Sequence, residues 1–121
     1  ESRIGQGKFR DDLIILWEKR CAISEYDDVN ILKASHIKPW KDSSDKEKLD
    51  RFNGLLLLPN YDELFDRGYI SFDNNGKIIF SACLSDDNRK ILNLPTDLRL
   101  RFICDEHRLY LEYHRNNVLI M

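Results

Sequence analysis

The chain has 121 residues, of which 42% are hydrophobic and 33% are charged, and its formal net charge is −2. This composition excludes a disordered chain, and apolar stretches such as residues 55–58 are far shorter than the roughly 20 residues that cross a bilayer. We therefore expect a single cytoplasmic domain over residues 1–121 with no membrane partner, and any contact with nucleic acid must come from local basic clusters.

The first part of the chain predicts a helix followed by extended segments. Apolar residues recur at helical spacing over residues 7–20, with acidic residues early and basic residues late, as the helix dipole favours. Residues 21–24 and 30–37 are expected to form a hairpin across a polar connection. Pro39 ends the second strand, and residues 41–48, which include no apolar side chain, are predicted to be an exposed loop.

The middle of the chain returns to apolar sequence and then changes to a helical pattern. Residues 53–58 predict a strand, and residues 61–67 predict a short helix. Asn60 and Glu63 have the spacing of a capping box at its start. Gly68 stands where a left-handed residue commonly ends a helix.

The last part of the chain contains one clear hairpin signal and three weaker patterns. Residues 69–81 alternate around an Asn-Asn-Gly turn, which predicts a β-hairpin. A short helix is expected over residues 86–90 and a strand over residues 98–103. Residues 106–118 predict a final helix that Asp105 would cap, although Leu109, Leu111 and Tyr113 also fit the alternation of a strand.

The three cysteines give no sign of a disulfide framework or a structural zinc site. Cys21, Cys83 and Cys104 are odd in number and far apart, and the sequence has no CxxC pair. We expect reduced, buried thiols and no structural zinc.

Five polar residues lie at the junctions of the predicted strand, loop, strand and helix: His36, Asn53, Asn60, Asp62 and Asp66. Histidine can take a proton from water near neutral pH, and His36 lies at the end of a predicted strand. Asp62 and Asp66 are four residues apart, so a helix places both carboxylates on one face, and such oxygens suit Mg²⁺. The pattern is compatible with phosphodiester hydrolysis, although each residue alone is more often structural. Asn53 stands before Gly54, and an Asn-Gly pair commonly forms a turn, so a structural role is the ordinary interpretation of Asn53 as well.

Three sequence blocks favour a catalytic role for these residues over a structural one, because the blocks occur together and in a fixed order. They are ASHIKPW at residues 34–40, FNGLLLLPN at 52–60 and LFDRG at 64–68. Through them the chain resembles the HNH, or ββα-metal, endonuclease family, in particular the branch common in bacterial restriction and defence proteins. The opening RIGQGKFR at residues 3–10 and CAIS at 21–24 resemble the segment that precedes the motif in that branch, so the resemblance covers roughly residues 3–81. The resemblance implies an α+β fold with a ββα-metal core, an N-terminal helix, an extra β-hairpin and a C-terminal helix.

The same resemblance implies roles for the polar residues. His36 would activate water as the general base, and Asn53 would orient the loop that carries the base. The third motif position, usually a histidine or asparagine that binds metal, falls on Asp62. Many members have an acid where this chain has Ser35, so Asp66, Asn60 or a main-chain carbonyl would have to complete the ligands. The candidate ligands of Mg²⁺ or Mn²⁺ are Asp62, Ser35 and Asp66.

Binding to DNA would depend on basic residues, which cluster near the start of the chain at Arg3, Lys8 and Arg10 and again around the histidine. The candidates for phosphate contact are Lys33, Lys38, Lys41, Arg67 and Arg10. Such contacts carry no sequence preference, so other domains or subunits of a larger protein would select the target. Two alternatives remain open: an inactive DNA-binding or assembly module with the same fold, and an interaction domain that does not bind nucleic acid.

Overall fold

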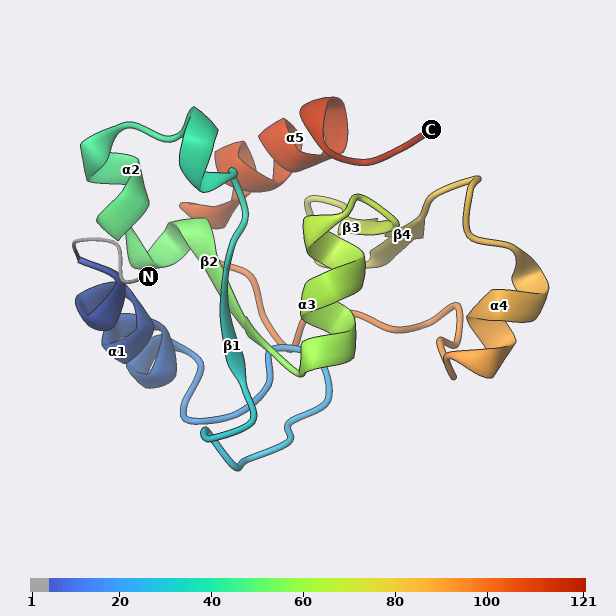
Figure 1. Ribbon diagram of the computed structural model, residues 1–121, viewed down its shortest axis with the longest axis horizontal. Helices are drawn as coiled ribbons and strands as arrows, with labels where there is room; N and C mark the ends of the chain where they lie inside the picture. The colour runs from blue at the N-terminus through green and yellow to red at the C-terminus, as the bar shows by residue number, and fades with distance from the viewer. Residues whose placement is uncertain (1–4) are drawn as a thin grey trace.

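The structure is a computed structural model that describes residues 5–121; Arg3 lies outside the described residues. Two short antiparallel sheets are surrounded by helices (Figure 1). In chain order the elements are α1 (Gln6–Leu16), β1 (Lys33–His36), the 3-10 helix η1 (Trp40–Asp42), α2 (Asp45–Leu49), the 3-10 helix η2 (Arg51–Asn53), β2 (Gly54–Leu57), α3 (Pro59–Asp66), β3 (Ile70–Phe72), β4 (Ile78–Phe80), α4 (Asp86–Ile91) and α5 (His107–Asn117).

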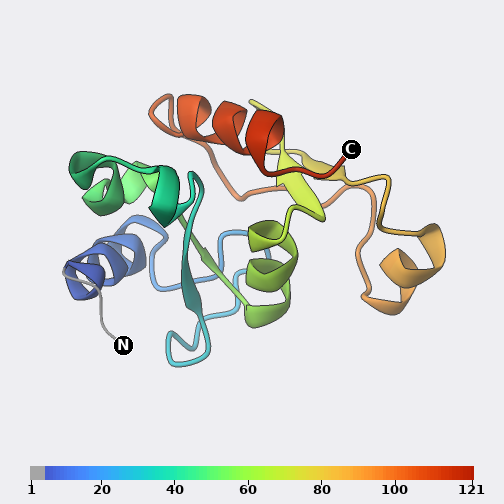
Figure 2. The same cartoon turned by 45° about the horizontal axis from the view of Figure 1, so that its top comes forward.

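The central unit consists of β1, β2 and α3. The two strands pair antiparallel with His36 opposite Gly54, and α3 packs against both of them. The leucines of β2, residues 55–57, have no exposed surface, so this strand lies in the middle of the core. The second sheet, β3 paired with β4, packs against α5, which runs along the top of both views (Figures 1 and 2). The predicted α+β fold with a ββα core is confirmed.

Helix α1 approaches β2 very closely at Gly54. A Cβ atom at this position would lie 2.6 Å from Phe9 Cζ and 2.7 Å from a methyl group of Leu13. Trp17 Nε1 donates a hydrogen bond to the Gly54 carbonyl at 3.3 Å. Gly54 has an extended backbone, so the Asn53–Gly54 pair is a site of close packing and not a turn.

The first predicted helix is correct in place but too long. It ends at Leu16, because Glu18 and Lys19 have positive φ values of 61° and 64°, which lie in the left-handed region. No basic residue lies in its last turn and no acidic residue in its first, so the expected match to the helix dipole is wrong.

The predicted strand at residues 21–24 and the predicted loop at residues 41–48 are also wrong. Residues 22–24 form a turn, and the main-chain N–H of Ala22 donates to Leu56 O at 2.7 Å. The partner of β1 is β2 and not residues 21–24, so the connection between the paired strands is longer than the predicted one. That connection contains α2, which begins at a reciprocal capping box between Ser44 and Glu47.

The ends of the later elements follow local backbone geometry. Helix α3 begins at Pro59, whose fixed φ suits the first helical position, and Asn60 does not cap it. Gly68 has the predicted left-handed conformation, with φ 79°. Instead of the strand predicted at residues 98–103, a single bridge joins Arg99 to Lys77.

The remaining predictions for the C-terminal part are confirmed except for one cap. The hairpin of β3 and β4 turns through Gly76 at φ 84°, α4 lies where a short helix was expected, and α5 lies where the final helix was expected. Helix α5 has Glu106 as its N-cap residue, without a side-chain hydrogen bond, and Asp105 does not cap it.

The cysteines differ from one another in burial. Cys21 is buried, as expected, whereas Cys104 is half-buried and Cys83 is exposed. The expectation of three buried thiols is therefore wrong. Over residues 5–121, none of the helices has the length and apolar character that crossing a membrane requires.

Candidate active site

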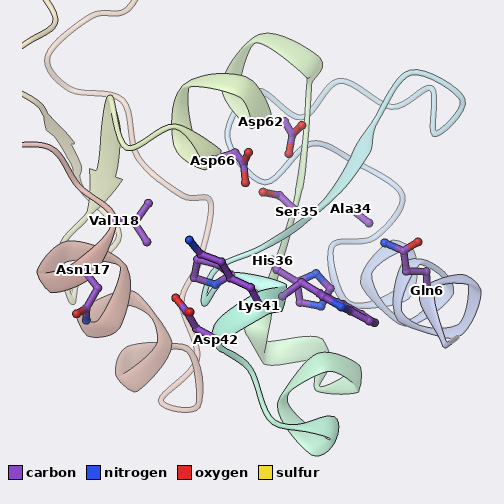
Figure 3. A pocket seen from close by; sticks show the side chains of 12 residues that line it. Gln6, Ala34, Ser35, His36, Lys41, Asp42, Asp62, Asp66, Asn117 and Val118 are labelled. Atoms are coloured by element: carbon purple, nitrogen blue, oxygen red, sulfur yellow. The ribbon is translucent and has the colours of Figure 1, made fainter. Parts of the chain in front are cut away.

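A pocket of about 630 Å³ opens where β1, η1 and α3 meet (Figure 3). It collects five of the residues singled out from the sequence: Ser35, His36, Lys41, Asp62 and Asp66. The other lining residues are Gln6, Ala34, Pro39, Trp40, Asp42, Asn117 and Val118. Residues far apart in the chain thus surround one open space that is large enough for a phosphate group and its neighbours.

Two aromatic rings and a hydrogen bond to a main-chain carbonyl hold His36. Its ring stacks on Phe9, with centroids 3.8 Å apart and planes 6° apart, and the ring of Trp40 stands edge-on at 5.5 Å. Its Nε2 lies 2.8 Å from the carbonyl oxygen of Lys48. Because a carbonyl only accepts, Nε2 carries a hydrogen, and in the neutral ring the lone pair that a general base requires is then on Nδ1.

Asn53 is fully buried and holds the segment between β1 and β2 from the inside. Its Oδ1 accepts from the main-chain N–H of Lys38 at 2.7 Å, and its Nδ2 donates to Glu47 O at 3.0 Å. The carbonyl of the next residue, Lys48, is the one that fixes His36. This geometry supports the predicted role of Asn53 in orienting the loop around the base.

Asp62 and Asp66 lie one turn apart on α3 and line the same pocket. Burial raises the pKa of Asp62, and the charges of Asp66 and Glu63 raise it further. A hydrogen bond from Ser35 and the charge of Lys33 lower the same pKa. A half-buried carboxylate next to another acid is electrostatically costly, so binding of a cation would be favourable here.

The donor set fits a hard cation that retains water. Within residues 5–121 there is no group of three His, Cys, Asp or Glu side chains arranged to hold a metal ion. Structural zinc requires four nitrogen or sulfur ligands, whereas Mg²⁺ commonly takes one or two carboxylates and keeps several waters. Asp62 and Asp66, with the Ser35 hydroxyl beside Asp62, offer oxygen ligands of the kind that a hard cation such as Mg²⁺ or Mn²⁺ takes.

One of the predicted phosphate-binding lysines lines the pocket, and a second lies close to one of its carboxylates. Lys41 is exposed and lines it, and Lys33 is exposed and close enough to influence Asp62. Lys38 instead pairs with Glu47, with Nζ 3.0 Å from Oε1, and does not line the pocket. Lys38 therefore differs from Lys41 and Lys33, because its ammonium group is already paired with a carboxylate.

The two arginines predicted to bind phosphate have different positions. Arg67 is exposed but pairs with Glu63 on the preceding turn of α3. The guanidinium of Arg10 donates to the carbonyls of Val29 and Leu32, at 2.6 and 2.8 Å. Arg10 thereby fixes the segment before β1, and we remove it from the phosphate-binding candidates.

Sequence reasoning missed several residues that line the pocket. Trp40 follows the HIKP sequence directly, so its proximity to His36 was a readable signal. Asp42 lies in the segment predicted as a loop, and it accepts a hydrogen bond from Tyr113 at 2.9 Å. Gln6 and Asn117 come from opposite ends of the described chain, and no local pattern could have placed them at this site.

Comparisons with known proteins agree with this architecture. Residues 21–73 match the family model described as HNH endonuclease, and this segment contains β1, β2 and α3. Among curated proteins no match was found.

A solved structure entitled "Modification dependent TagI restriction endonuclease" has a similar fold, with a TM-score of 0.63 and 18% sequence identity. The alignment covers 98% of this chain but only 40% of that chain, so this chain spans less than half of its length. At this level of identity the likeness shows the fold alone. The family match and the ββα geometry together support the assignment of residues 21–73 of this chain to the HNH endonuclease family.

Proposed function

We propose that this chain is a nuclease domain that hydrolyses phosphodiester bonds in DNA, with His36 as general base and one Mg²⁺ or Mn²⁺ ion held by Asp62 and Asp66. The observation that carries the proposal is the shared pocket: His36 comes from β1 and the two carboxylates come from α3, yet all three side chains line it (Figure 3). Both the proton acceptor and the cation ligands would therefore reach one phosphate.

Different residues of the chain would carry out proton transfer and phosphate binding during hydrolysis. Nδ1 of His36 would accept a proton from the attacking water, while Lys48 O keeps the hydrogen on Nε2. Lys41 and Lys33 would contact phosphate oxygens and hold the DNA backbone over the pocket. When bound, the divalent cation would stabilise negative charge on the scissile phosphate and on the departing 3′ oxygen.

Target selection would reside in other domains or subunits. The net charge of −2 provides no general attraction to DNA, and phosphate contacts carry no sequence information. The match to only 40% of a longer restriction endonuclease chain supports a role as one part of a larger protein.

A cleavage assay with plasmid DNA tests the proposal. We expect the protein to nick or linearise the plasmid in Mg²⁺ or Mn²⁺ and to be inactive in EDTA. Asp62→Asn should lower the cleavage rate by about 100-fold or more, since the metal contributes several kcal/mol of charge stabilisation. The matched control is Asp87→Asn, which removes an exposed acid in the first turn of α4, outside the pocket.

Two other results would overturn the proposal. DNA binding that weakens with salt, without cleavage in either metal, would identify an inactive DNA-binding module. Absence of both binding and cleavage would favour an interaction domain.

A further inference from the structure

Helix α5 lies outside the segment that matches the family, yet it contacts the connection between β1 and β2 through two tyrosine hydroxyls. Tyr110 donates to Asp50 Oδ2 at 2.7 Å, and Tyr113 donates to Asp42 Oδ2 at 2.9 Å. The two tyrosines are three residues apart, so they project from neighbouring positions on one side of the helix. Both hydrogen bonds end on the same connecting segment.

Both hydroxyls remain donors over a wide pH range. Burial and the hydrogen bond to Asp50 raise the pKa of Tyr110 well above its ordinary value. The hydrogen bond to Asp42 is the main cause that raises the pKa of Tyr113. Each tyrosine therefore stays protonated and keeps its hydrogen bond to a carboxylate oxygen, and hydrogen bonds of this kind are stronger than those between two neutral groups.

The two acceptor residues lie at important points of the connection. Asp42 lines the pocket itself. Asp50 accepts from the main-chain N–H of Phe52 through Oδ1, and its own N–H donates to Glu47 O at 3.3 Å. Lys48, whose carbonyl fixes His36, lies between Glu47 and Asp50. A shift of Asp50 would therefore move the carbonyl that orients the base.

A third contact joins the same two regions. Lys38 forms its ion pair with Glu47, and its ammonium group lies 4.9 Å from the centroid of the Tyr113 ring. Asn53 holds the Glu47 carbonyl from the buried side. The connection is thus fixed from inside by Asn53 and from outside by α5.

We infer that Tyr110 and Tyr113 are positioning residues of the active site, holding the β1–β2 connection so that Lys48 O and Asp42 keep their places beside His36. The inference rests on the proposed nuclease function. Its physical reason is the narrow tolerance of catalytic geometry, since displacements of about 1 Å can lower a rate by about 100-fold. The catalytic unit of this chain would then extend beyond residues 21–73 to α5.

The first test compares Tyr110→Phe, Tyr113→Phe and the double variant with the wild-type protein. Phenylalanine keeps the ring and removes only the hydroxyl. We expect the single-turnover cleavage rate at saturating DNA to fall by about ten-fold for Tyr110→Phe, the size of one hydrogen bond to a charged group. Tyr113→Phe should have a smaller effect because its hydrogen bond is exposed. KM should not change, since neither tyrosine lines the pocket.

The matched control is Tyr26→Phe, which removes a hydroxyl from an exposed tyrosine in the irregular segment between α1 and β1. It should leave the rate unchanged. Rates equal to wild type in both α5 variants would overturn the inference, and so would a rise in KM at unchanged kcat.

A second test does not depend on DNA cleavage. In NMR spectra, solvent exchange of the His36 Nε2–H should be about ten-fold faster in the double variant, because the Lys48 carbonyl is held less firmly. The Nε2–H of His114, which is bonded to Phe65 O at 2.8 Å, is the internal reference and should not change.

The two tests separate the possible failures. If the wild-type protein does not cut DNA, the nuclease proposal fails while the exchange of His36 still decides whether α5 positions it. Equal acceleration of exchange at His36 and His114 would indicate general loosening of the fold and would overturn the positioning role. Unchanged exchange at His36 would overturn it as well.

Discussion

Two regions of the molecule are built around a histidine in nearly the same way. His36 stacks on Phe9 and His114 stacks on Phe65, in each case with ring centroids 3.8 Å apart. Each histidine has Nε2 at 2.8 Å from a main-chain carbonyl, that of Lys48 for His36 and that of Phe65 for His114. An aromatic stack and a fixed tautomer are therefore not sufficient to identify a catalytic histidine.

The two regions differ in what surrounds the rest of the ring. His114 is only 1% exposed, and its Nδ1 lies 2.8 Å from the Ser71 hydroxyl, which donates to it. Burial lowers its pKa to about 4. His36 is partly exposed and lines a pocket with Asp62 and Asp66. Access to water and to acidic neighbours, and not the packing of the ring, makes one histidine a candidate base and the other a structural residue.

Replacing each histidine with alanine tests this contrast most strongly. His36→Ala should lower the single-turnover cleavage rate by about 100-fold to 10 000-fold, the usual contribution of a general base. His114→Ala should instead lower the free energy of unfolding by several kcal/mol, because it leaves a cavity and an unpaired carbonyl at Phe65. Cleavage kinetics and urea denaturation measure the two effects. A comparable loss of rate per folded molecule in both variants would remove the distinction.

The stability of the protein should fall in acid because of His114. Its pKa is about 4 in the folded state against an ordinary value of 6.5, so the unfolded chain binds the proton first as the pH falls. The stability present above pH 6.5 is therefore lost progressively between pH 6.5 and pH 4. The loss amounts to roughly 3 kcal/mol for this residue.

Urea denaturation at pH 7 and at pH 4.5 measures this dependence. His114→Gln should reduce the difference between the two pH values. The part that remains includes His107, whose pKa burial also lowers. An unchanged difference in the variant would show that His114 is not the source.

Gly54→Ala should disturb the His36 region without touching the His114 region. Its Cβ would lie 2.6 Å from Phe9 Cζ, and Phe9 is the ring on which His36 stacks. We expect a loss of about 1–3 kcal/mol in unfolding free energy from overpacking, together with a lower cleavage rate. Gly7→Ala is the matched control, because nothing lies within 4 Å of its Cβ and alanine favours the helix. A stable, fully active Gly54→Ala protein would show that Phe9 does not support the base.

Local patterns predicted much of the central unit. The strand at β1, the apolar β2, the helix α3 and the β3–β4 hairpin follow from alternation, proline and glycine signals, and all are present. The errors concern pairing and termini. The partner of β1 was misassigned because strand pairing depends on which apolar segments meet in the core, whereas α2 was missed although its Ser44–Glu47 capping box is a local signal.

The sequence by itself determined the residue types for the chemistry and their family resemblance. His36, Asp62 and Asp66 were candidates because imidazole and carboxylate groups suit proton transfer and cation binding whatever the fold. Only the tertiary structure placed them in one pocket and assigned His114 to the core.

The tertiary structure also decided which cations face the site. Arg10 donates hydrogen bonds to two main-chain carbonyls and Lys38 forms an ion pair with Glu47, whereas Lys41 lines the pocket. The link from Tyr110 to Asp50 spans 60 positions of the chain. Contacts of this kind have no periodic signature, because they depend on where folding brings distant segments and not on neighbouring residues.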